Sequence, residues 1–392
     1  MRAVFLTHYF PPEPGAPQTR IAEVAAGLAA RGAEVTVHTG FPHYPHGTVA
    51  APYRNRPLLR ERAGAVRVVR SAVYPAANRG FARRLADHLA FCASSLATAA
   101  ASGPADVVVV ETPPLFLAAS GALYARAKRA PLVLNVADLW PASAVALGAL
   151  RSPRAVALAE GLERFAYAQA AAISVPTAGI EAALAATGKT ARIGPAVDVA
   201  RFAGLPEPPA GGPLRVLYAG TTGLAQGVGT LLEAAALAGE AVELTVAGGG
   251  AESDALARAL PPNARMTGVV GRDAVPGLYA AAHAGAVLLR DRPLFEGALP
   301  TKLFECMAAG RPVVVAARGE AAELVRRTGC GLAVAPEDPR ALADALLRLA
   351  ADPELRARLG AAGRAAAAAE FSRERSIDAW AALLERAAQG TR

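Results

Sequence analysis

The sequence predicts an α/β fold of two doubly wound parallel sheets, and three observations support this prediction. At 392 residues the chain is longer than one ordinary hydrophobic core requires. Unbroken runs of Val, Leu and Ile alternate with stretches of helical periodicity, which is typical of parallel strands covered on both faces. A Pro- and Gly-rich segment at 203–213 interrupts this pattern, which then restarts. We therefore expect two lobes that face a common cleft, with ligands bound beyond the carboxyl ends of the strands.

The first lobe begins with a strand, a helix and a second strand. Apolar residues at helical spacing between Ile21 and Leu28 predict the helix, and Gly32 follows as a stop signal. Continuous apolar runs such as "DVVVV" and "PLVLNV" then recur between further helical stretches. Strands of this lobe are expected at residues 2–7, 33–39, 106–110, 131–136 and 171–176.

The second lobe repeats the same alternation after the break. Its strands are expected at residues 214–220, 242–250, 264–270, 284–290, 311–317 and 331–336. A last helical stretch near 372–387 is expected to return to the first lobe. The predicted domains are an N-terminal domain at 1–200, a linker at 201–213, a C-terminal domain at 214–370 and a final helix at 371–392.

The charge balance does not favour a nucleic-acid partner. The formal net charge is +8, carried almost entirely by arginine, with lysine only at Lys128, Lys189 and Lys302. A bias toward Ala, Arg, Gly and Pro explains this charge, and attraction to phosphates or an anionic surface is the alternative. Aromatic residues make up 5% of the chain and no basic tract interleaves with them, so no nucleic-acid partner is expected.

The cysteines and apolar runs favour a cytoplasmic location. Cys92, Cys306 and Cys330 are too far apart for a disulfide framework or a zinc motif, which suits a reducing compartment. No apolar run reaches the roughly 18 residues of a spanning helix. The apolar N-terminal run is too short for a signal peptide.

A glycine-rich stretch at the start of the second lobe is a candidate diphosphate site. The segment "GTTGLAQGVG" (220–229) joins a strand to a helix that is expected to start near residue 227. Its glycines permit close approach of a ligand to the backbone, and the free N–H groups of a helix start favour an anion. An ordinary strand-to-helix turn uses glycine in the same way, so both interpretations stay open here.

The segment "LPTKLFECMAAGRPVVV" (299–315) carries a more specific signal. It predicts a helix entry at Pro300, with Thr301 as the N-cap. Lys302 and Glu305 then share one helix face through their i, i+3 spacing. A nucleotide diphosphate needs a cation for its phosphate oxygens and a carboxylate for its ribose hydroxyls. A surface ion pair is the alternative, but apolar surroundings and a lysine in an arginine-rich chain favour the nucleotide site.

Further candidates lie where strands are expected to end. Arg290 follows a strand of the second lobe and is a candidate phosphate contact, as is Arg292 less strongly, although either could be a solvated loop charge. In the first lobe, Gly15 precedes a helix, and Asp138 could orient a sugar hydroxyl or cap a helix.

The sequence does not indicate a metal. His43 and His46 lie in the loop "GFPHYPHG" (40–47), but the sequence shows no third ligand for them, so they are interpreted as loop residues near an acceptor. No D-x-D motif occurs to hold a Mg²⁺-bridged diphosphate.

Together these motifs resemble a family-four glycosyltransferase of the GT-B fold, built from two Rossmann-like domains. The segments that carry the resemblance are "VDVARF" (197–202), the glycine loop, "LRDRPLFEGALPTKLFECMAAGRPVV" (289–314) and "GEAAELV" (319–325). The segments "YFPPEPGAPQTR" (9–20), "GFPHYPHG" (40–47) and "DLWP" (138–141) resemble the bacterial surface-polysaccharide branch, which transfers amino sugars. The likeness spans nearly the whole chain.

The resemblance implies retaining transfer of a sugar, expected to be an N-acetylated amino sugar, from a UDP-linked donor without metal or other cofactor. Glu305 would bind the ribose hydroxyls, and Lys302 with the Gly220 loop would bind the diphosphate. The leaving phosphate would accept the acceptor's proton, so no separate base is expected. The implied donor-binding residues are Gly15, Gly220, Thr221, Thr222, Gln226, Arg290, Thr301, Lys302, Leu303 and Glu305, and the implied catalytic residues are Lys302, Asp138, Glu296 and Arg290.

The chain departs from the family pattern at two places. Thr221 and Gln226 stand where many members have Arg and Lys, so the positive charge is expected to come from Arg290 and Lys302. The family's first glutamate, eight residues before Glu305, is replaced by Gly297, and the nearest acid is Glu296. Whether Glu296 substitutes for it stays open.

The segment 78–100 bears on the acceptor. It combines Arg79, Arg83 and Arg84 with an apolar helical stretch, which suits either peripheral contact with an anionic inner membrane face or a core helix with a basic entry. The resemblance adds a saccharide or a lipid-diphosphate-linked saccharide as the acceptor.

Two other functions fit the same architecture. A nucleotide-sugar 2-epimerase would need carboxylates and histidines around one sugar carbon, and the sequence does not assemble that set. A non-catalytic two-lobed sugar-binding protein would usually carry an export signal.

Overall fold

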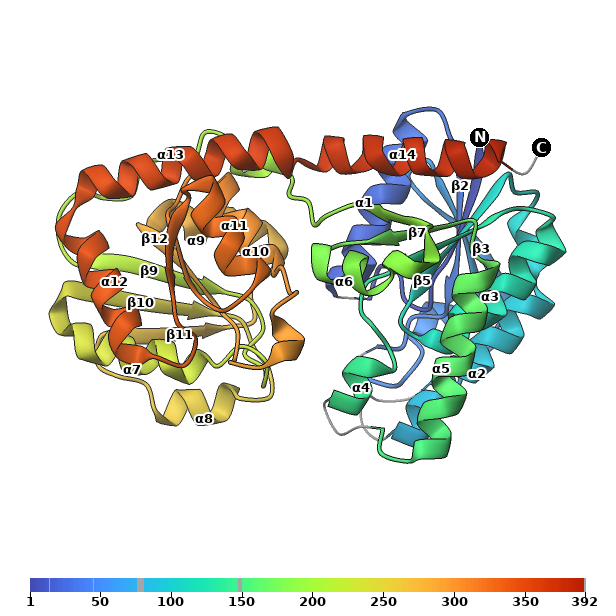
Figure 1. Cartoon of the computed structure of the whole chain (residues 1–392), viewed down its shortest axis with the longest axis horizontal. Helices are drawn as coiled ribbons and strands as arrows, with labels where there is room; N and C mark the ends of the chain where they lie inside the picture. The colour runs from blue at the N-terminus through green and yellow to red at the C-terminus, as the bar shows by residue number, and fades with distance from the viewer. Residues whose placement is uncertain (14, 45, 76–80, 147–149, 391–392) are drawn as a thin grey trace. The chain divides into compact units, whose positions relative to one another are not determined.

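The structure is a computed structural model that describes residues 1–13, 15–44, 46–75, 81–146 and 150–390 (Figure 1). It consists of two compact α/β units. Unit 1 contains Met1–Ile193 and Ser376–Arg392, and unit 2 contains Gly194–Arg375. Each unit has its own parallel sheet with its own hydrophobic clusters, which confirms the predicted fold class.

Unit 1 contains an eight-stranded sheet with the order β3-β4-β2-β1-β5-β6-β7-β8. All its strand pairs are parallel except β3 and β4, which pair in antiparallel fashion at one edge. The strands are β1 (Arg2–Leu6), β2 (Glu34–Gly40), β3 (Leu58–Ala63), β4 (Val66–Ser71), β5 (Val107–Thr112), β6 (Leu132–Val136), β7 (Ala172–Val175) and β8 (Thr190–Arg192). The five strands predicted from apolar runs are confirmed, and β3, β4 and β8 are additional.

Helices cover both faces of this sheet. Helices α1 and α14 pack on one face, where the Trp380 ring of α14 lies 6.5 Å from the Phe5 ring of β1. Helices α2, α3 and α5 pack on the other face (Figure 1). The helices are α1 (Ala16–Ala30), α2 (Phe81–Ala97), α3 (Leu115–Lys128), α4 (Ala142–Ala146), α5 (Pro153–Gln169), α6 (Ala178–Ala183) and α14 (Arg373–Gln389), with 3-10 turns η1 (Ala51–Tyr53), η2 (Ala99–Ser102) and η3 (Ala185–Thr187).

Unit 2 contains a six-stranded, fully parallel sheet with the order β11-β10-β9-β12-β13-β14. The strands are β9 (Leu214–Ala219), β10 (Val242–Ala247), β11 (Ala264–Gly268), β12 (Ala284–Leu288), β13 (Val313–Ala316) and β14 (Gly331–Val334). All six were predicted from the sequence. The helices are α7 (Val228–Ala238), α8 (Ser253–Arg258), α9 (Val275–Ala281), α10 (Thr301–Ala308), α11 (Glu320–Thr328), α12 (Pro339–Ala351) and α13 (Pro353–Glu370), with 3-10 turns η4 (Val199–Phe202), η5 (Gly239–Ala241), η6 (Arg272–Ala274) and η7 (Pro293–Phe295).

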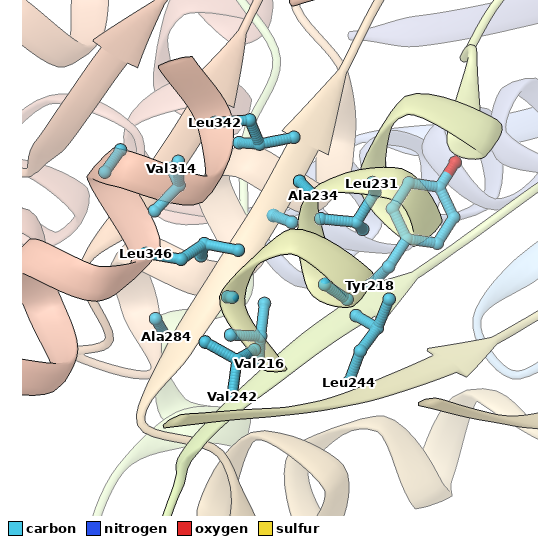
Figure 2. Close-up of a cluster of buried hydrophobic side chains, with 14 of the residues drawn as sticks. Val216, Tyr218, Leu231, Ala234, Val242, Leu244, Ala284, Val314, Leu342 and Leu346 are labelled. Carbon is cyan, nitrogen blue, oxygen red and sulfur yellow. The ribbon is translucent and has the colours of Figure 1, made fainter. Parts of the chain in front are cut away.

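The apolar run of β9 is unbroken because successive side chains point to opposite faces of the sheet, where each face packs against a different hydrophobic cluster. Val216 and Tyr218 belong to the cluster under α7 and α12, where Figure 2 shows Leu231 and Leu346 among their neighbours. Leu217 belongs to the cluster that contains α10. Both faces of the strand therefore need apolar residues. Polar groups that could bind a ligand are found beyond the strand ends instead. No helix in the described ranges is long and apolar enough to cross a membrane.

Candidate functional site

Two glycines bring the loops after β9 and β10 together in unit 2. Gly220 and Gly248 have φ values of 149° and 143°, a conformation that side chains disfavour. The N–H of Gly220 donates to the carbonyl of Ala247 at 2.8 Å. A Cβ on Gly248 would lie 1.8 Å from the carbonyl oxygen of Gly220, so only glycine permits this approach. The result is a tightly folded backbone at the carboxyl edge of the sheet, where ligands bind in such folds.

The side chains of the glycine loop mostly stabilise the loop itself. Thr222 is buried, and its Oγ1 lies 2.8 Å from Oγ of Ser253. Oε1 of Gln226 accepts a hydrogen bond from the N–H of Gly223 at 3.1 Å. Thr221 is exposed, although its carbonyl accepts from the Tyr218 hydroxyl at 2.5 Å. A donor contact by any of these residues stays a prediction.

Helix α10 begins one residue earlier than expected. Pro300 is the N-cap with extended backbone, and Thr301 is the first helical residue, with no side-chain cap bond. The prediction of Thr301 as N-cap is therefore wrong. The reason is that a capping hydroxyl must precede the first helical residue to reach the free N–H groups. The Thr301 side chain is exposed instead.

Lys302 is the most unusual residue of unit 2. Only 8% of it is exposed, and its Nζ lies 3.7 Å from the centroid of the Tyr218 ring. Among the residues that the structure describes, this Nζ has no hydrogen-bond partner. A Cβ on Gly220 would lie 2.9 Å from the Nζ, so the ammonium lies directly against the glycine backbone. A glycine at 220 therefore makes room for the lysine as well as for the turn.

The environment of Lys302 predicts that it binds an anion. Burial lowers the pKa of Lys302 to about 7, and the nearby carboxylate of Glu305 opposes this shift only in part. A buried ammonium without hydrogen bonds is costly, and the cation–π contact with Tyr218 compensates for only part of that cost. An oxyanion bound beside Gly220 would supply the missing acceptors.

Glu305 and Leu303, the neighbours of Lys302 in α10, differ in how they could contact a donor. Glu305 is half-buried and close enough to Lys302 to affect its pKa. Leu303 is fully buried in the core, and its N–H already donates to the carbonyl of Pro300 at 3.0 Å. Any contact of Leu303 with a donor would therefore involve its backbone.

Arg290 holds the glycine loop in place. Its Nε donates to the carbonyl of Leu224 at 2.7 Å, and its two terminal nitrogens lie 2.8 Å from Glu252 and 3.2 Å from Glu337. These partners already use much of its donor capacity, so a phosphate contact stays a prediction. The guanidinium of Arg292 donates to the carbonyl of Asp291 at 2.8 Å.

The side chain of Glu296 is exposed, while its backbone supports helix α11. Its carbonyl accepts from the N–H of Glu320 at 2.7 Å. Whether its carboxylate contacts a donor sugar is not decided by these contacts, so that role stays a prediction.

The candidates of unit 1 are placed separately. Gly15 is the N-cap of α1 with a φ of 152°, and the buried side chain of Gln18 packs directly against it. Asp138 accepts a hydrogen bond from the hydroxyl of Ser143 at 2.8 Å. Helix α4 begins at Ala142, four residues further on, so Asp138 is not its N-cap.

A buried histidine–carboxylate cluster in unit 1 is absent from the sequence-based prediction. The structure brings His8 and Asp87 to His43, whereas His46 is exposed. His8 and Asp87 are 79 residues apart, so no local spacing could have revealed the cluster.

The basic apolar segment at 78–100 contains helix α2, and its first residues, including Arg79, lie outside the described part of the chain. One face of α2 packs into the core through Phe91 and Cys92. Arg83 and Arg84 are exposed. The core-helix interpretation is therefore right for one face, and the outward face stays a candidate for membrane contact.

The paired parallel-sheet units, with a glycine loop and a lysine-bearing helix in the second, define the GT-B class of glycosyltransferases. Two family descriptions match the chain: a glycosyl transferase 4-like domain at residues 15–213, and glycosyl transferases group 1 at residues 213–352. The chain belongs to the glycosyl transferase 4-like family.

Individual relatives agree with this assignment. The D-inositol 3-phosphate glycosyltransferase of Xylanimonas cellulosilytica is 34% identical over 186 residues, which are 45% of this chain and 42% of that protein. The chain thus aligns with less than half the length of this curated relative. Sucrose-phosphate synthase from Thermosynechococcus elongatus has a similar fold (TM-score 0.77, 20% identity, 98% of this chain and 99% of that one). So does Anabaena HepE, solved in complex with UDP (TM-score 0.72, 18% identity, 98% and 100%).

Proposed function

We propose that the protein is a retaining glycosyltransferase that moves an N-acetylated amino sugar from a UDP-linked donor to a saccharide acceptor without a metal at the reacting diphosphate. Unit 2 would bind the donor and unit 1 the acceptor. One observation supports this proposal above all others: the buried Lys302 ammonium beside Gly220 has no hydrogen-bond partner among the described residues.

A diphosphate suits this position better than a neutral ligand. Its oxygens could accept hydrogen bonds from Lys302 and from backbone N–H groups of the glycine loop. The pKa of Lys302, about 7 without ligand, would rise when the anion binds, so the site would gain a full positive charge with its ligand. Glu305, half-buried on the same helix, would accept hydrogen bonds from the ribose hydroxyls.

The transfer itself would require positioning more than acid–base residues. The bond between the anomeric carbon and the phosphate oxygen breaks, and the acceptor oxygen bonds to the same face of that carbon. The acceptor's proton passes to the departing phosphate oxygen, so atoms and charge balance without a separate protein base. Lys302 would stabilise the negative charge that develops on the leaving diphosphate.

The choice of donor has two supports. HepE, which shares the fold, was solved with UDP bound. The loop motifs of the first unit resemble the branch that transfers amino sugars. The most direct test is incubation with UDP-, GDP- and dTDP-linked sugars and a saccharide acceptor in the presence of a chelator, with product detected by mass spectrometry. We expect transfer from a UDP-N-acetylamino sugar.

The two alternative functions give different outcomes in the same assay. Conversion of the donor into an epimer without any acceptor would identify a 2-epimerase. Nucleotide-sugar binding without turnover would identify a binding protein. Absence of both binding and turnover across all three nucleotides would contradict the proposed donor site.

Replacing Glu305 by alanine is expected to weaken UDP binding by about 10-fold or more, because hydrogen bonds to a charged group contribute roughly 1.5–3 kcal/mol. Isothermal titration calorimetry with UDP measures this directly. Glu323→Ala, which removes an exposed carboxylate from α11, is the matched control and should bind UDP like the wild type. Equal UDP affinity in Glu305→Ala and the control would show that Glu305 does not contact the ribose.

We also propose that the acceptor is a lipid-diphosphate-linked saccharide and that the outward face of α2 contacts an anionic membrane. Arg83 and Arg84 are exposed on this face, and 46% of Leu89 is exposed one to two turns further on. A basic residue near an anionic bilayer contributes about 1 kcal/mol to binding.

The double variant Arg83→Gln/Arg84→Gln should therefore bind vesicles containing phosphatidylglycerol roughly 30-fold more weakly in a sedimentation assay. Arg348→Gln/Arg358→Gln removes the same charge from exposed positions of unit 2 and is the matched control. An equal loss in both variants would indicate a general charge effect and contradict docking through α2.

A further inference from the structure

We propose that His8, His43 and Asp87 bind a divalent transition-metal ion of the zinc type in unit 1. The site would be structural and made only of residues of unit 1, whereas the proposed donor site is made of residues of unit 2. His8 follows β1, His43 follows β2, and Asp87 lies in α2, so the ion would join two loops at the carboxyl edge of the sheet to a helix that covers it.

The three side chains converge on one point. Nε2 of His8 lies 2.9 Å from Oδ2 of Asp87, and Nε2 of His43 lies 3.0 Å from the same oxygen. The candidate ligand atoms all lie within 4.8 Å of one another. Two ligands of a tetrahedral zinc at bond lengths near 2.0–2.1 Å are about 3.3 Å apart, so only small shifts are needed to admit the ion.

The hydrogen bonding of His43 calls for a cation at this point. Its Nδ1 lies 2.8 Å from the carbonyl oxygen of Phe41, which can only accept. Its Nε2 faces the carboxylate of Asp87, which also accepts when ionised. A neutral imidazole has one N–H, so it satisfies only one of these contacts. Either a second proton or a metal ion must lie between Nε2 and Asp87, and a ring N–H bonded to a backbone carbonyl is the usual arrangement of a metal-ligating histidine.

Asp87 offers a further ligand atom. Its Oδ1 is buried and has no hydrogen-bond partner within the described ranges, and the same holds for Nδ1 of His8. Buried carboxylate oxygens are normally satisfied by donors or metals. A bidentate Asp87 with the two histidines would give four ligand atoms, the coordination number of structural zinc.

The surroundings support a closed site. Side chains of His8, His43 and Asp87 are only 1–2% exposed, and the rings of Tyr9 and Phe91 pack 4.3 Å and 5.0 Å from the His8 ring. Glu13 is occupied elsewhere, because its Oε1 accepts from the backbone N–H groups of His43 and Tyr44 at 2.9 Å and 2.8 Å. Two imidazoles and a carboxylate without an open position suit zinc better than a redox metal.

The test uses the full chain purified without a polyhistidine tag, because such a tag would itself bind metal. After equilibrium dialysis against buffered Zn²⁺, metal content is measured by inductively coupled plasma mass spectrometry. We expect about one zinc per chain in the wild type. Asp87→Asn, which keeps the shape of the side chain and removes its charge, should lower zinc affinity more than about 10-fold. His46→Gln is the matched control and should retain wild-type affinity.

A spectroscopic measurement covers the case in which Asp87→Asn does not fold. Co²⁺ added to the wild type should give the intense visible bands of a tetrahedral N/O site, and Zn²⁺ should displace it. A wild type that binds no zinc, or Co²⁺ bands typical of octahedral coordination, would overturn the proposal and leave His43 as a protonated ring paired with Asp87. Donor binding to unit 2 is measured separately with UDP, so failure of one proposal leaves the other testable.

Discussion

Lys302→Met is expected to lower the turnover of sugar transfer by about 100- to 1,000-fold, the usual cost of removing one group that stabilises charge in a transition state. Methionine nearly matches the length of the lysine stem and retains its packing over Tyr218, so the change isolates the ammonium. Because Nζ lies against Gly220 rather than in solvent, neither water nor a neighbouring arginine can easily replace it. Arg290, another cationic candidate from the sequence, is engaged by Glu252 and Glu337.

The measurement is the initial rate at saturating donor and acceptor, so that a loss of affinity is separated from a loss of turnover. Lys189→Met is the matched control, since the Lys189 ammonium donates to the carbonyls of Tyr167 and Ala168 in unit 1. That variant should transfer sugar at the wild-type rate. A Lys302→Met enzyme with wild-type turnover would remove Lys302 from the reaction and reduce it to a packing residue.

The fold of both units could be predicted from the sequence because their central strands are buried on both faces. Four of the six residues of β5 and three of the four residues of β13 are valine, and such runs have few interpretations other than a parallel strand. Strands β3 and β8, at the two edges of the sheet of unit 1, lack such runs and were missed. The sequence of β3, "LLRERA", has three consecutive charged residues at a partly exposed edge, so it carries no unbroken apolar run.

The donor site could be predicted from the sequence only in part. Lys302 and Glu305 are close in sequence, so their i, i+3 spacing on a helix was sufficient to place them on one face. Two features of the site could not be predicted from the sequence. The contact of Lys302 with Tyr218 and Gly220 joins segments more than eighty residues apart, and the burial that lowers the lysine pKa exists only in the folded unit. The cluster around Asp87 could not be predicted from sequence spacing either, because its members come from three separate parts of the chain.

The same Lys302→Met substitution should stabilise the protein, which is the opposite of its effect on transfer. Without a ligand, burial lowers the pKa of Lys302 in the folded chain to about 7 from 10.5. The folded state therefore disfavours the charged lysine that the unfolded chain carries at neutral pH. Each unit by which folding lowers the pKa corresponds to about 1.4 kcal/mol of lost stability when the lysine is charged in the unfolded chain. Methionine removes this cost because it has no charge to bury.

The sign of the pH dependence follows from the two pKa values. Above pH 10.5 the lysine is neutral in both states, so the electrostatic cost vanishes. As the pH falls toward 7 the unfolded chain takes up a proton that the folded chain does not, and the cost grows. Below pH 7 it is constant. The variant should therefore gain on the order of 4–5 kcal/mol over the wild type at pH 6 and only about 2 kcal/mol at pH 9.

Urea denaturation of the wild type, Lys302→Met and Lys189→Met at both pH values measures this difference. The control should gain no stability at either pH, because it loses a lysine that already has hydrogen-bond partners. A donor concentration that saturates both proteins should stabilise the wild type more than Lys302→Met, since the bound diphosphate also neutralises the buried charge that the variant lacks. A variant no more stable than the wild type at pH 6 would mean that the ammonium is already satisfied in the ligand-free protein. The main argument for an anion beside Gly220 would then fail, because a satisfied lysine has no need of a phosphate.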